Sequence, residues 1–263
     1  MKKESTKLII AISSRALFNL DHSHQIFKEE GIEAYAKHQQ ENEGVVLEPG
    51  VGFTLVKKLL KLNSKKTPID VILLTRNSAD TGLRIFNSIE HYGLNISRAA
   101  FTRGESTHPF VGAFEADLFL SSNYNDVQKA LQSGFAAASI IESKSNNSHP
   151  SQLRIAFDGD AVIFSDESER VFQEKGLDAF HENEKLAEKI ELKAGPFKSF
   201  LVSLQKIQST FPEENNPIRT ALVTARSAPA HKRVIHTMRE WGIRIDESFF
   251  LGGLDKGVFL REF

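Results

Sequence analysis

Cysteine is absent from the 263 residues of this chain. Its absence excludes disulfides, thiol catalysis and any zinc or iron–sulfur site that depends on cysteine ligands. A surplus of charge of one sign is also missing, because 33 Lys and Arg residues face 34 Asp and Glu residues, for a formal net charge of −1. This balance gives no electrostatic reason to expect nucleic acid or an anionic membrane as a partner.

Long hydrophobic runs are lacking as well. No stretch approaches the ~18 apolar residues that a membrane-spanning helix needs. The N-terminus weakly imitates a signal peptide, but the apolar run Leu8–Ile12 is short, Arg15 follows it, and no small-residue cleavage site comes next. We therefore expect a cytoplasmic protein. Its composition, 40% hydrophobic and 25% charged, is typical of globular proteins, and its length allows one large domain or two small ones.

The most informative stretch of the sequence covers residues 153–167. The apolar run Leu153–Phe157 predicts a buried parallel strand, and it ends in Asp158-Gly159-Asp160. Because open α/β sheets place their chemistry just past the carboxyl ends of such strands, we expect both carboxylates at one crevice. A divalent cation between them would offset their repulsion. The alternative interpretation of this tripeptide alone is a strand followed by an Asx-type turn.

Strand and helix patterns alternate in the first half of the chain, which predicts an α/β fold. Strands are expected at Lys7–Ile12, at Val71–Leu74, within Ala113–Leu120 and at Ala137–Ile141. Helices are expected at Phe27–His38, from Phe53 onward, from Leu83 to Gly93 and from Val127 to Gly134. The polar segment Glu142–Ser151 has no periodicity and is the best linker candidate.

The pattern then restarts after this linker. A shift of 149 positions lays Ile69–Thr75 on Ile218–Thr224, and matches continue without a gap at Ser78, Arg84, Gly93, Phe101 and Gly104. A shift of 145 positions lays Phe27, Gly31 and Ala34 on Phe172, Gly176 and Ala179. Ordered matches at nearly one offset predict two copies of one α/β unit, although strand–helix units can also resemble one another by chance.

The two predicted copies differ in their acidic residues. In the first copy, Ser13 and Arg15 occupy the positions of Asp158 and Asp160. We therefore predict a non-catalytic copy at residues 1–145, a linker at 146–152 and a catalytic unit at 153–263 with a small cap insertion at about 165–195. The counterpart of the last strand of the first copy would end at about position 290, so the second unit is expected to be truncated at its C-terminus.

Three features after the linker supply the groups that phosphoryl transfer through an aspartyl-phosphate needs. Asp158 can attack phosphorus, and Asp160, two residues on in an extended strand, can protonate the leaving alcohol and then activate water. Thr224 ends a predicted strand beside a predicted helix start, where a hydroxyl and backbone N–H groups can bind phosphate. Lys256 lies between glycines and can supply positive charge. Mg²⁺ takes oxygen ligands and neutralises the charge of carboxylate and phosphate.

Each of these residues also has an ordinary structural interpretation. A lone Thr224 is typical of a strand end or helix N-cap, and a lone Lys256 of a solvated surface lysine. Arg226 and Arg219 fit a surface position or an ion pair better than a clamp on substrate. The order of the motifs, rather than any single residue, therefore carries the prediction.

In that order the sequence resembles the haloacid-dehalogenase-like phosphohydrolases, and more closely the cytosolic 5′-nucleotidases of type I. The resemblance covers nearly the whole chain, and its most specific part is residues 152–170. The other matching stretches are residues 11–18, 87–92, 217–219 and 222–228. It implies two tandem doubly wound units, haloacid-dehalogenase-like and Rossmannoid, of which the second is catalytic. It implies Mg²⁺-dependent hydrolysis of nucleoside 5′-monophosphates to nucleoside and phosphate through an aspartyl-phosphate.

The resemblance also assigns roles to individual residues. Asp158 is the expected nucleophile and Asp160 the expected acid and base, and both are expected at the metal, Asp160 through its backbone carbonyl. The phosphate is expected to be held by Thr224, Ala225 and Lys256. The acidic motif that completes the Mg²⁺ site in the family falls at about position 270, beyond the end of this sequence.

The predicted cap insertion, at about residues 165–195, is expected to select the substrate. Ser165, Asp166 and Arg226 are the candidate contacts to the nucleotide, although an exposed, charged helix start explains the first two equally well. The implied partners are a nucleoside monophosphate substrate, a nucleotide effector and further copies of the chain in a homo-oligomer. Two alternatives stay open: the same chemistry on another phosphomonoester, such as a sugar phosphate, or nucleotide binding without turnover.

Overall fold

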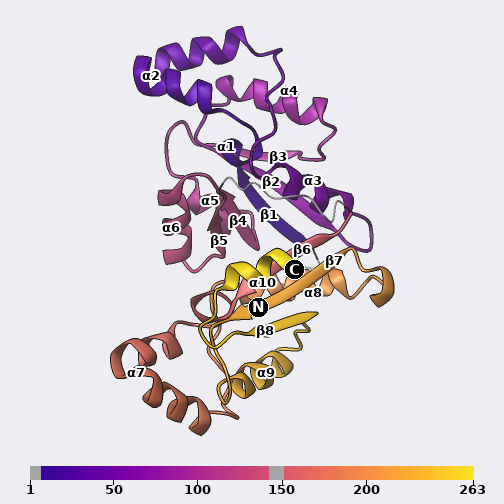
Figure 1. Cartoon of the computed structure of the whole chain (residues 1–263). Helices are drawn as coiled ribbons and strands as arrows, with labels where there is room; N and C mark the ends of the chain where they lie inside the picture. The colour runs from indigo at the N-terminus through magenta and orange to yellow at the C-terminus, as the bar shows by residue number, and fades with distance from the viewer. Residues whose placement is uncertain (1–6, 142–150) are drawn as a thin grey trace. The chain divides into compact units, whose positions relative to one another are not determined.

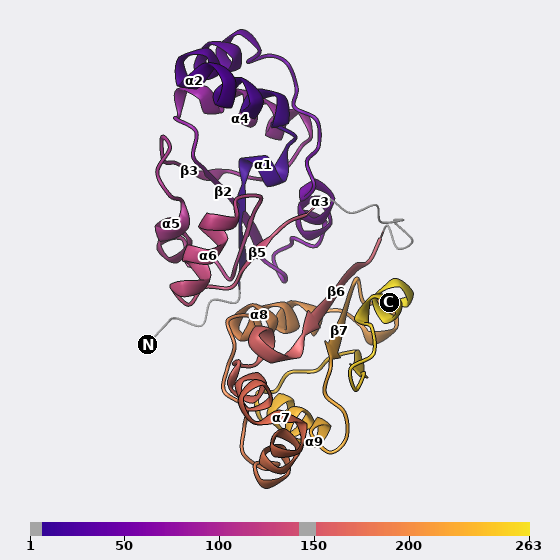
Figure 2. The ribbon, with the colours of Figure 1, turned by 60° about the vertical axis from the view of Figure 1, so that its left-hand side comes forward.

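The structure is a computed structural model that describes residues 7–141 and 151–263. The chain divides into two compact units, Met1–Ser148 and His149–Phe263 (Figures 1 and 2). Most of the linker predicted at residues 146–152 lies outside the described residues. Within the described ranges, no helix is long and apolar enough to cross a membrane. The sheets of both units are parallel, so the chain is a mixed α/β protein.

The first unit is built on a five-stranded parallel sheet with the strand order β3-β2-β1-β4-β5. Its strands are β1 (Leu8–Ser13), β2 (Ile69–Thr75), β3 (Arg98–Phe101), β4 (Leu118–Ser121) and β5 (Ala137–Ser139). The unbroken apolar runs of β1 and β2 are buried, as expected for parallel strands covered on both faces. The strand order changes direction beside β1, and α/β sheets bind ligands at the carboxyl ends of the strands flanking such a switch point.

Helices connect these strands and cover both faces of the sheet. They are α1 (Ser14–Leu17), α2 (Asp21–Glu41), α3 (Phe53–Lys61), η1 (Asp80–Gly82), α4 (Leu83–His91), α5 (His108–Ala113) and α6 (Tyr124–Gln132). In both views α5 and α6 lie on one side of the sheet and α3 on the other. On the α5 and α6 side, Val111, Val127 and Ala130 pack with Ile9 and Ala11 of β1 in one core.

The second unit has a three-stranded parallel sheet with the strand order β6-β7-β8. Its elements are β6 (Leu153–Asp158), η2 (Gly159–Ile163), α7 (Glu167–Leu186), α8 (Lys198–Gln208), η3 (Glu213–Asn215), β7 (Ile218–Thr224), α9 (His231–Glu240), β8 (Glu247–Phe250) and α10 (Lys256–Glu262). On α8, Phe200, Leu201, Leu204 and Ile207 are buried in the core of the unit. Residue pairing in the sheet sets Asp158 beside Val223, one residue before the end of β7.

In each unit, a long segment leaves the sheet after the first strand and returns to the end of that strand. We call this segment the excursion; it lies between residues 18 and 49 in the first unit and between residues 164 and 194 in the second. An antiparallel bridge closes each one, between Phe18 and Pro49 in the first unit and between Phe164 and Ala194 in the second. Backbone hydrogen bonds flank both bridges, for example from the Ser165 N–H to the Lys193 carbonyl oxygen at 2.9 Å. The 165–195 segment is therefore anchored at both ends to the same turn.

Each excursion consists of a helix that changes direction at a glycine. The helix α2 breaks at Gly31 (φ +88°) and α7 breaks at Gly176 (φ +82°), with ψ near 180° at both. This backbone region is essentially restricted to glycine. The sequence predicted a continuous helix over 27–38, and Gly31 corrects that prediction.

Candidate functional site

The candidate site lies at the carboxyl ends of β6 and β7. Asp158 is the last residue of β6 and Thr224 the last of β7. Gly159 allows close contact between these ends, because a Cβ atom there would lie 3.2 Å from the Thr224 Oγ1. Thr224 is buried, and its Oγ1 accepts a hydrogen bond from the Arg226 N–H at 3.2 Å. The ends of β6 and β7 therefore lie close together at Gly159 and Thr224.

Asp158 and Lys256, which are 98 positions apart in the sequence, form an ion pair at this site. The Lys256 Nζ donates to the Asp158 Oδ2 at 2.6 Å, and the Gly159 N–H donates to the Asp158 Oδ1 at 2.8 Å. The two side chains are 45% and 35% exposed, so a substrate can reach them. Lys256 is therefore not a merely solvated surface lysine. An exposed pair of this kind contributes only about 0–1 kcal/mol to stability.

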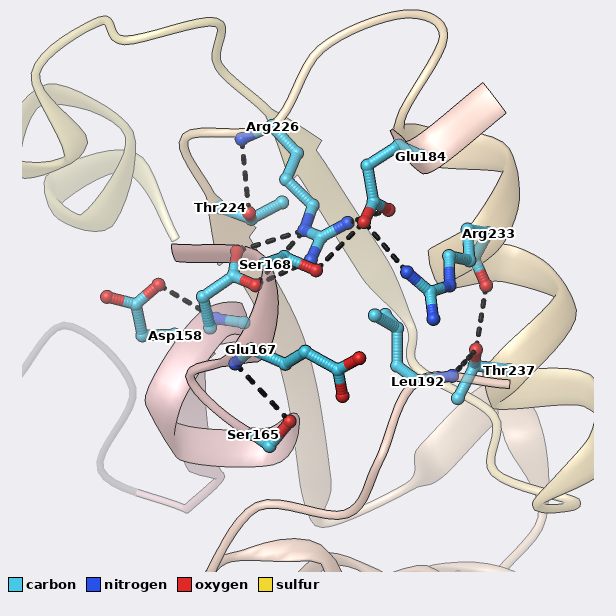
Figure 3. Close-up of polar contacts among 12 residues, drawn as sticks. Asp158, Ser165, Glu167, Ser168, Glu184, Leu192, Thr224, Arg226, Arg233 and Thr237 are labelled. Atoms are coloured by element: carbon cyan, nitrogen blue, oxygen red, sulfur yellow. Dashed lines mark hydrogen bonds and ion pairs between the residues drawn. The ribbon is translucent and has the colours of Figure 1, made fainter. Parts of the chain in front are cut away.

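Asp160 has a different partner. The Arg226 Nε donates to the Asp160 Oδ2 at 2.9 Å and the Arg226 Nη2 donates to Oδ1 at 2.6 Å, which is a two-pronged, charge-assisted contact. Figure 3 shows the Asp158 carboxylate pointing away from Arg226. The extended strand that was predicted to carry both acids ends at Asp158, and residues 159–163 form a turn instead. The alternation argument for two carboxylates on one side of a strand is therefore wrong.

Arg226 also reaches a fully buried carboxylate on α7. Its Nη1 contacts the Oε2 of Glu184, a side chain with 0% exposure (Figure 3). The other oxygen of Glu184 accepts from the Arg233 Nη1 at 2.9 Å and from the Ser168 hydroxyl at 2.8 Å. Burial acts to lower the pKa of the Arg226 guanidinium, but the hydrogen bonds and negative charges of its two carboxylate partners outweigh burial and raise that pKa.

The remaining candidate residues are less closely connected to the two acids. Ser165 is half-buried, and its hydroxyl accepts from the Glu167 N–H at 3.5 Å. Asp166 is exposed and pairs with Arg170 at 3.5 Å. Among residues 151–263, no hydrogen bond or ion pair joins Ser165 or Asp166 to Asp158 or Asp160. Their contact with substrate stays a prediction.

The predicted helix start beside Thr224 is wrong. The helix α9 begins at His231, and residues 225–230 form a loop in which Ala225 is exposed. Proline disfavours a helical conformation in the residue before it, so Pro229 prevents a helix from running through Ala228. Any backbone N–H group that binds phosphate here therefore belongs to a loop rather than to a helix N-terminus.

The sequence of this chain is similar to known proteins. The family described as 5′-nucleotidase matches residues 1–263. Human cytosolic 5′-nucleotidase 1B is 40% identical over 272 residues, an alignment that covers 98% of this chain and 45% of the human protein. The chain belongs to the cytosolic 5′-nucleotidase type I family. It spans about half the length of this human relative. No solved structure matches it.

The metal expected from the family resemblance was tested against the oxygen donors of the site. The described ranges contain no group of three or more His, Asp or Glu side chains arranged to hold a metal ion. Mg²⁺ at phosphate sites often uses only one or two carboxylates and takes its other ligands from water and phosphate. The half-exposed Asp158 carboxylate fits that mode, whereas the Asp160 carboxylate is occupied by Arg226.

The sequence predictions assigned no role at this site to two of its residues, Glu184 and Arg233. Arg233 had been noted only as a match in the repeat. The same comparison contained a signal for Glu184, because a shift of 145 positions lays Gln39 on it. An amide in one half and a carboxylate of the same shape in the other half indicates a position where only the charge differs.

Proposed function

We propose that this chain hydrolyses nucleoside 5′-monophosphates to nucleoside and inorganic phosphate through an aspartyl-phosphate. The observation that carries the proposal is the pairing of Asp158 with Lys256 at the carboxyl end of β6, beside the buried Thr224. The name of the human relative, a cytosolic 5′-nucleotidase, agrees with this substrate class and with a cytosolic location, which we also propose.

In the first step, an Asp158 carboxylate oxygen attacks phosphorus and the bond from phosphorus to the 5′ oxygen of the nucleoside breaks. Asp160 gives its proton to that leaving oxygen. Lys256 and the Thr224 hydroxyl stabilise the negative charge on the phosphoryl oxygens, together with the backbone at Ala225. In the second step, water attacks phosphorus, its proton passes to Asp160, and the bond between Asp158 and phosphorus breaks to release phosphate.

Mg²⁺ is the cofactor that we propose for this site. Asp158, with the backbone carbonyl of Asp160, would hold it. When bound, the ion would neutralise negative charge shared by the nucleophile and the phosphate. The exposure of Asp158 supports this assignment, because its carboxylate is accessible to an ion that keeps several waters.

We further propose that the two units are tandem haloacid-dehalogenase-like copies, and that the first is non-catalytic. Matching bridges after the first strand and matching glycine breaks in α2 and α7 support the duplication. The first unit has Ser13 and Arg15 where the second has its two acids, and these residues cannot act as nucleophile and acid in the same way. We also propose that the 165–195 segment selects the substrate. The chain is further proposed to bind a nucleotide effector and to form a homo-oligomer.

The test is phosphate release from AMP, IMP, CMP and a sugar phosphate, each with and without Mg²⁺. We expect release from the nucleotides with Mg²⁺, little release from the sugar phosphate, and none from any ester with the Asp158→Asn variant. Equal turnover of the sugar phosphate would favour a general phosphomonoesterase. Calorimetry that detects nucleotide binding without any phosphate release would favour a binding protein. Turnover of AMP by Asp158→Asn at the parent rate would contradict the mechanism.

A further inference from the structure

A buried cluster of charged side chains connects Asp160 to the helix α7. We call Asp160, Arg226, Glu184, Arg233 and Ser168 the Arg226 cluster. Figure 3 labels the last four of these residues. Arg226 is 2% exposed and lies between the two carboxylates, and its guanidinium carbon is 5.5 Å from the centre of the Phe180 ring. Each charged group faces a group of opposite charge, as buried ions must.

The first unit provides a natural comparison for this cluster, because its framework is the same. Arg84 matches Arg233, and the Ser88 hydroxyl matches that of Thr237. The Ser88 hydroxyl donates to the Arg84 carbonyl oxygen at 2.8 Å, and the Thr237 hydroxyl donates to the Arg233 carbonyl oxygen at 2.8 Å. Each hydroxyl also accepts a backbone N–H at 2.9 Å, from Leu47 or Leu192 respectively. These contacts attach the excursion to the rest of its unit. They occur in both units, whether or not the unit carries the two acids.

Three positions of the cluster change together between the units. Where the second unit has Asp160, Arg226 and Glu184, the first has Arg15, Asn77 and Gln39. Gln39 is buried, and Asn77 accepts a hydrogen bond from the Tyr35 hydroxyl at 2.8 Å instead of binding a carboxylate. The first unit, which lacks the proposed catalytic acid, thus also lacks the counterparts of Arg226 and Glu184. It keeps the framework residues Arg84 and Ser88.

We propose that Arg226 and Glu184 are positioning residues for Asp160. This inference rests on the proposed function, because it assigns them a task in the same reaction. The two-pronged contact from Arg226 fixes the orientation of the Asp160 carboxyl group, through which the proton passes to the leaving oxygen. Glu184 fixes the plane of the guanidinium from its other edge, and thereby couples α7 to the acid.

The test separates proton donation from folding by the choice of leaving group. An alkyl leaving oxygen, as in AMP, needs a proton, whereas the phenolate that leaves para-nitrophenyl phosphate does not. For Arg226→Gln we expect the first-turnover rate with AMP to fall by about 100-fold, the lower range of a general-acid contribution. The burst of nitrophenolate should stay within about threefold of the parent burst. Equal losses on both esters would overturn the proposal.

Two further variants of the same cluster sharpen this test. Glu184→Gln installs the side chain that the first unit carries at Gln39, and we expect about a tenfold loss with AMP and little loss in the nitrophenolate burst. Arg226→Lys keeps the charge but not the planar fork, so we expect an intermediate loss with AMP. A Lys variant no better than Gln on AMP would contradict a role for charge at this position.

The control is Arg84→Gln, which removes a buried arginine from the first unit, the counterpart of Arg233. We expect it to lower the stability of that unit and to leave both ester reactions unchanged. A parent chain inactive on both esters would contradict the proposed function and this inference together. An active parent with equal losses on the two esters in Arg226→Gln would contradict only this inference.

Discussion

Arg84 in the first unit and Arg233 in the second hold the same place in their units. The Nε of each donates at 2.8 Å to a backbone carbonyl of its own excursion, that of Val45 in one case and Ile190 in the other. This contact ties the excursion to the helix after the second strand. Because it occurs in both units, it belongs to the framework rather than to a reaction.

The two arginines differ in the side chain that their guanidinium groups contact. Arg233 meets the carboxylate of Glu184, whereas Arg84 faces the amide of Gln39 at 3.4 Å and has no carboxylate partner among the described residues. Burial lowers the pKa of Arg84, although the Tyr35 phenol opposes this. In the first unit a buried arginine at this place therefore has a neutral partner. In the second unit Glu184 pairs with Arg233 and also with Arg226, which contacts Asp160.

The largest expected difference between the units is catalytic. Asp160→Asn should lower kcat for AMP by about 10²–10⁴-fold, because the amide can neither give nor take the proton. Arg15→Ala, at the matching position of the first unit, should leave kcat unchanged. Steady-state phosphate release measures both. A loss of turnover in Arg15→Ala or Ser13→Ala, with fold and nucleotide binding intact, would show that the first unit takes part in the reaction.

The site residues that lie at the ends of strands could be predicted from the sequence. Buried apolar runs mark strands such as β6 and β7, and the residues that follow such runs lie at one edge of a parallel sheet. This reasoning brought Asp158 and Thr224 together, as the structure does. Lys256 was included because of its glycine neighbours and the order of the motifs. Its ion pair with Asp158 supports that inclusion.

The cluster behind Asp160 could not be predicted in the same way. Glu184 stands in a strongly charged stretch, Glu182–Lys185, which is typical of a solvated helix face. It is buried on the part of α7 that follows the break at Gly176, and helical periodicity does not register a break of that kind. The repeat offers the remaining signal, since it aligns Glu184 with an amide of equal shape.

A smaller expected difference concerns stability. Glu184→Ala leaves Arg226 and Arg233 buried with one carboxylate fewer, so the second unit should lose about 3–5 kcal/mol of unfolding free energy. Gln39→Ala removes only an amide and should cost the first unit about 1–3 kcal/mol. Denaturant unfolding can follow each unit separately, because the single tryptophan, Trp241, lies in the second unit and all three tyrosines lie in the first. Equal losses would mean that the buried charges stabilise the fold no more than amides do.

The smallest expected effect is one that should be the same in both units. Gly31→Ala and Gly176→Ala each force a side chain into a backbone region that residues other than glycine rarely adopt, at a cost of about 1–3 kcal/mol. Neither position has an atom within 4 Å of the new Cβ, so strain in the backbone and not a clash sets the cost. The same denaturant experiment measures it. Matching losses would support a shared framework, whereas a loss confined to Gly176→Ala would show that only the 165–195 segment depends on the glycine turn.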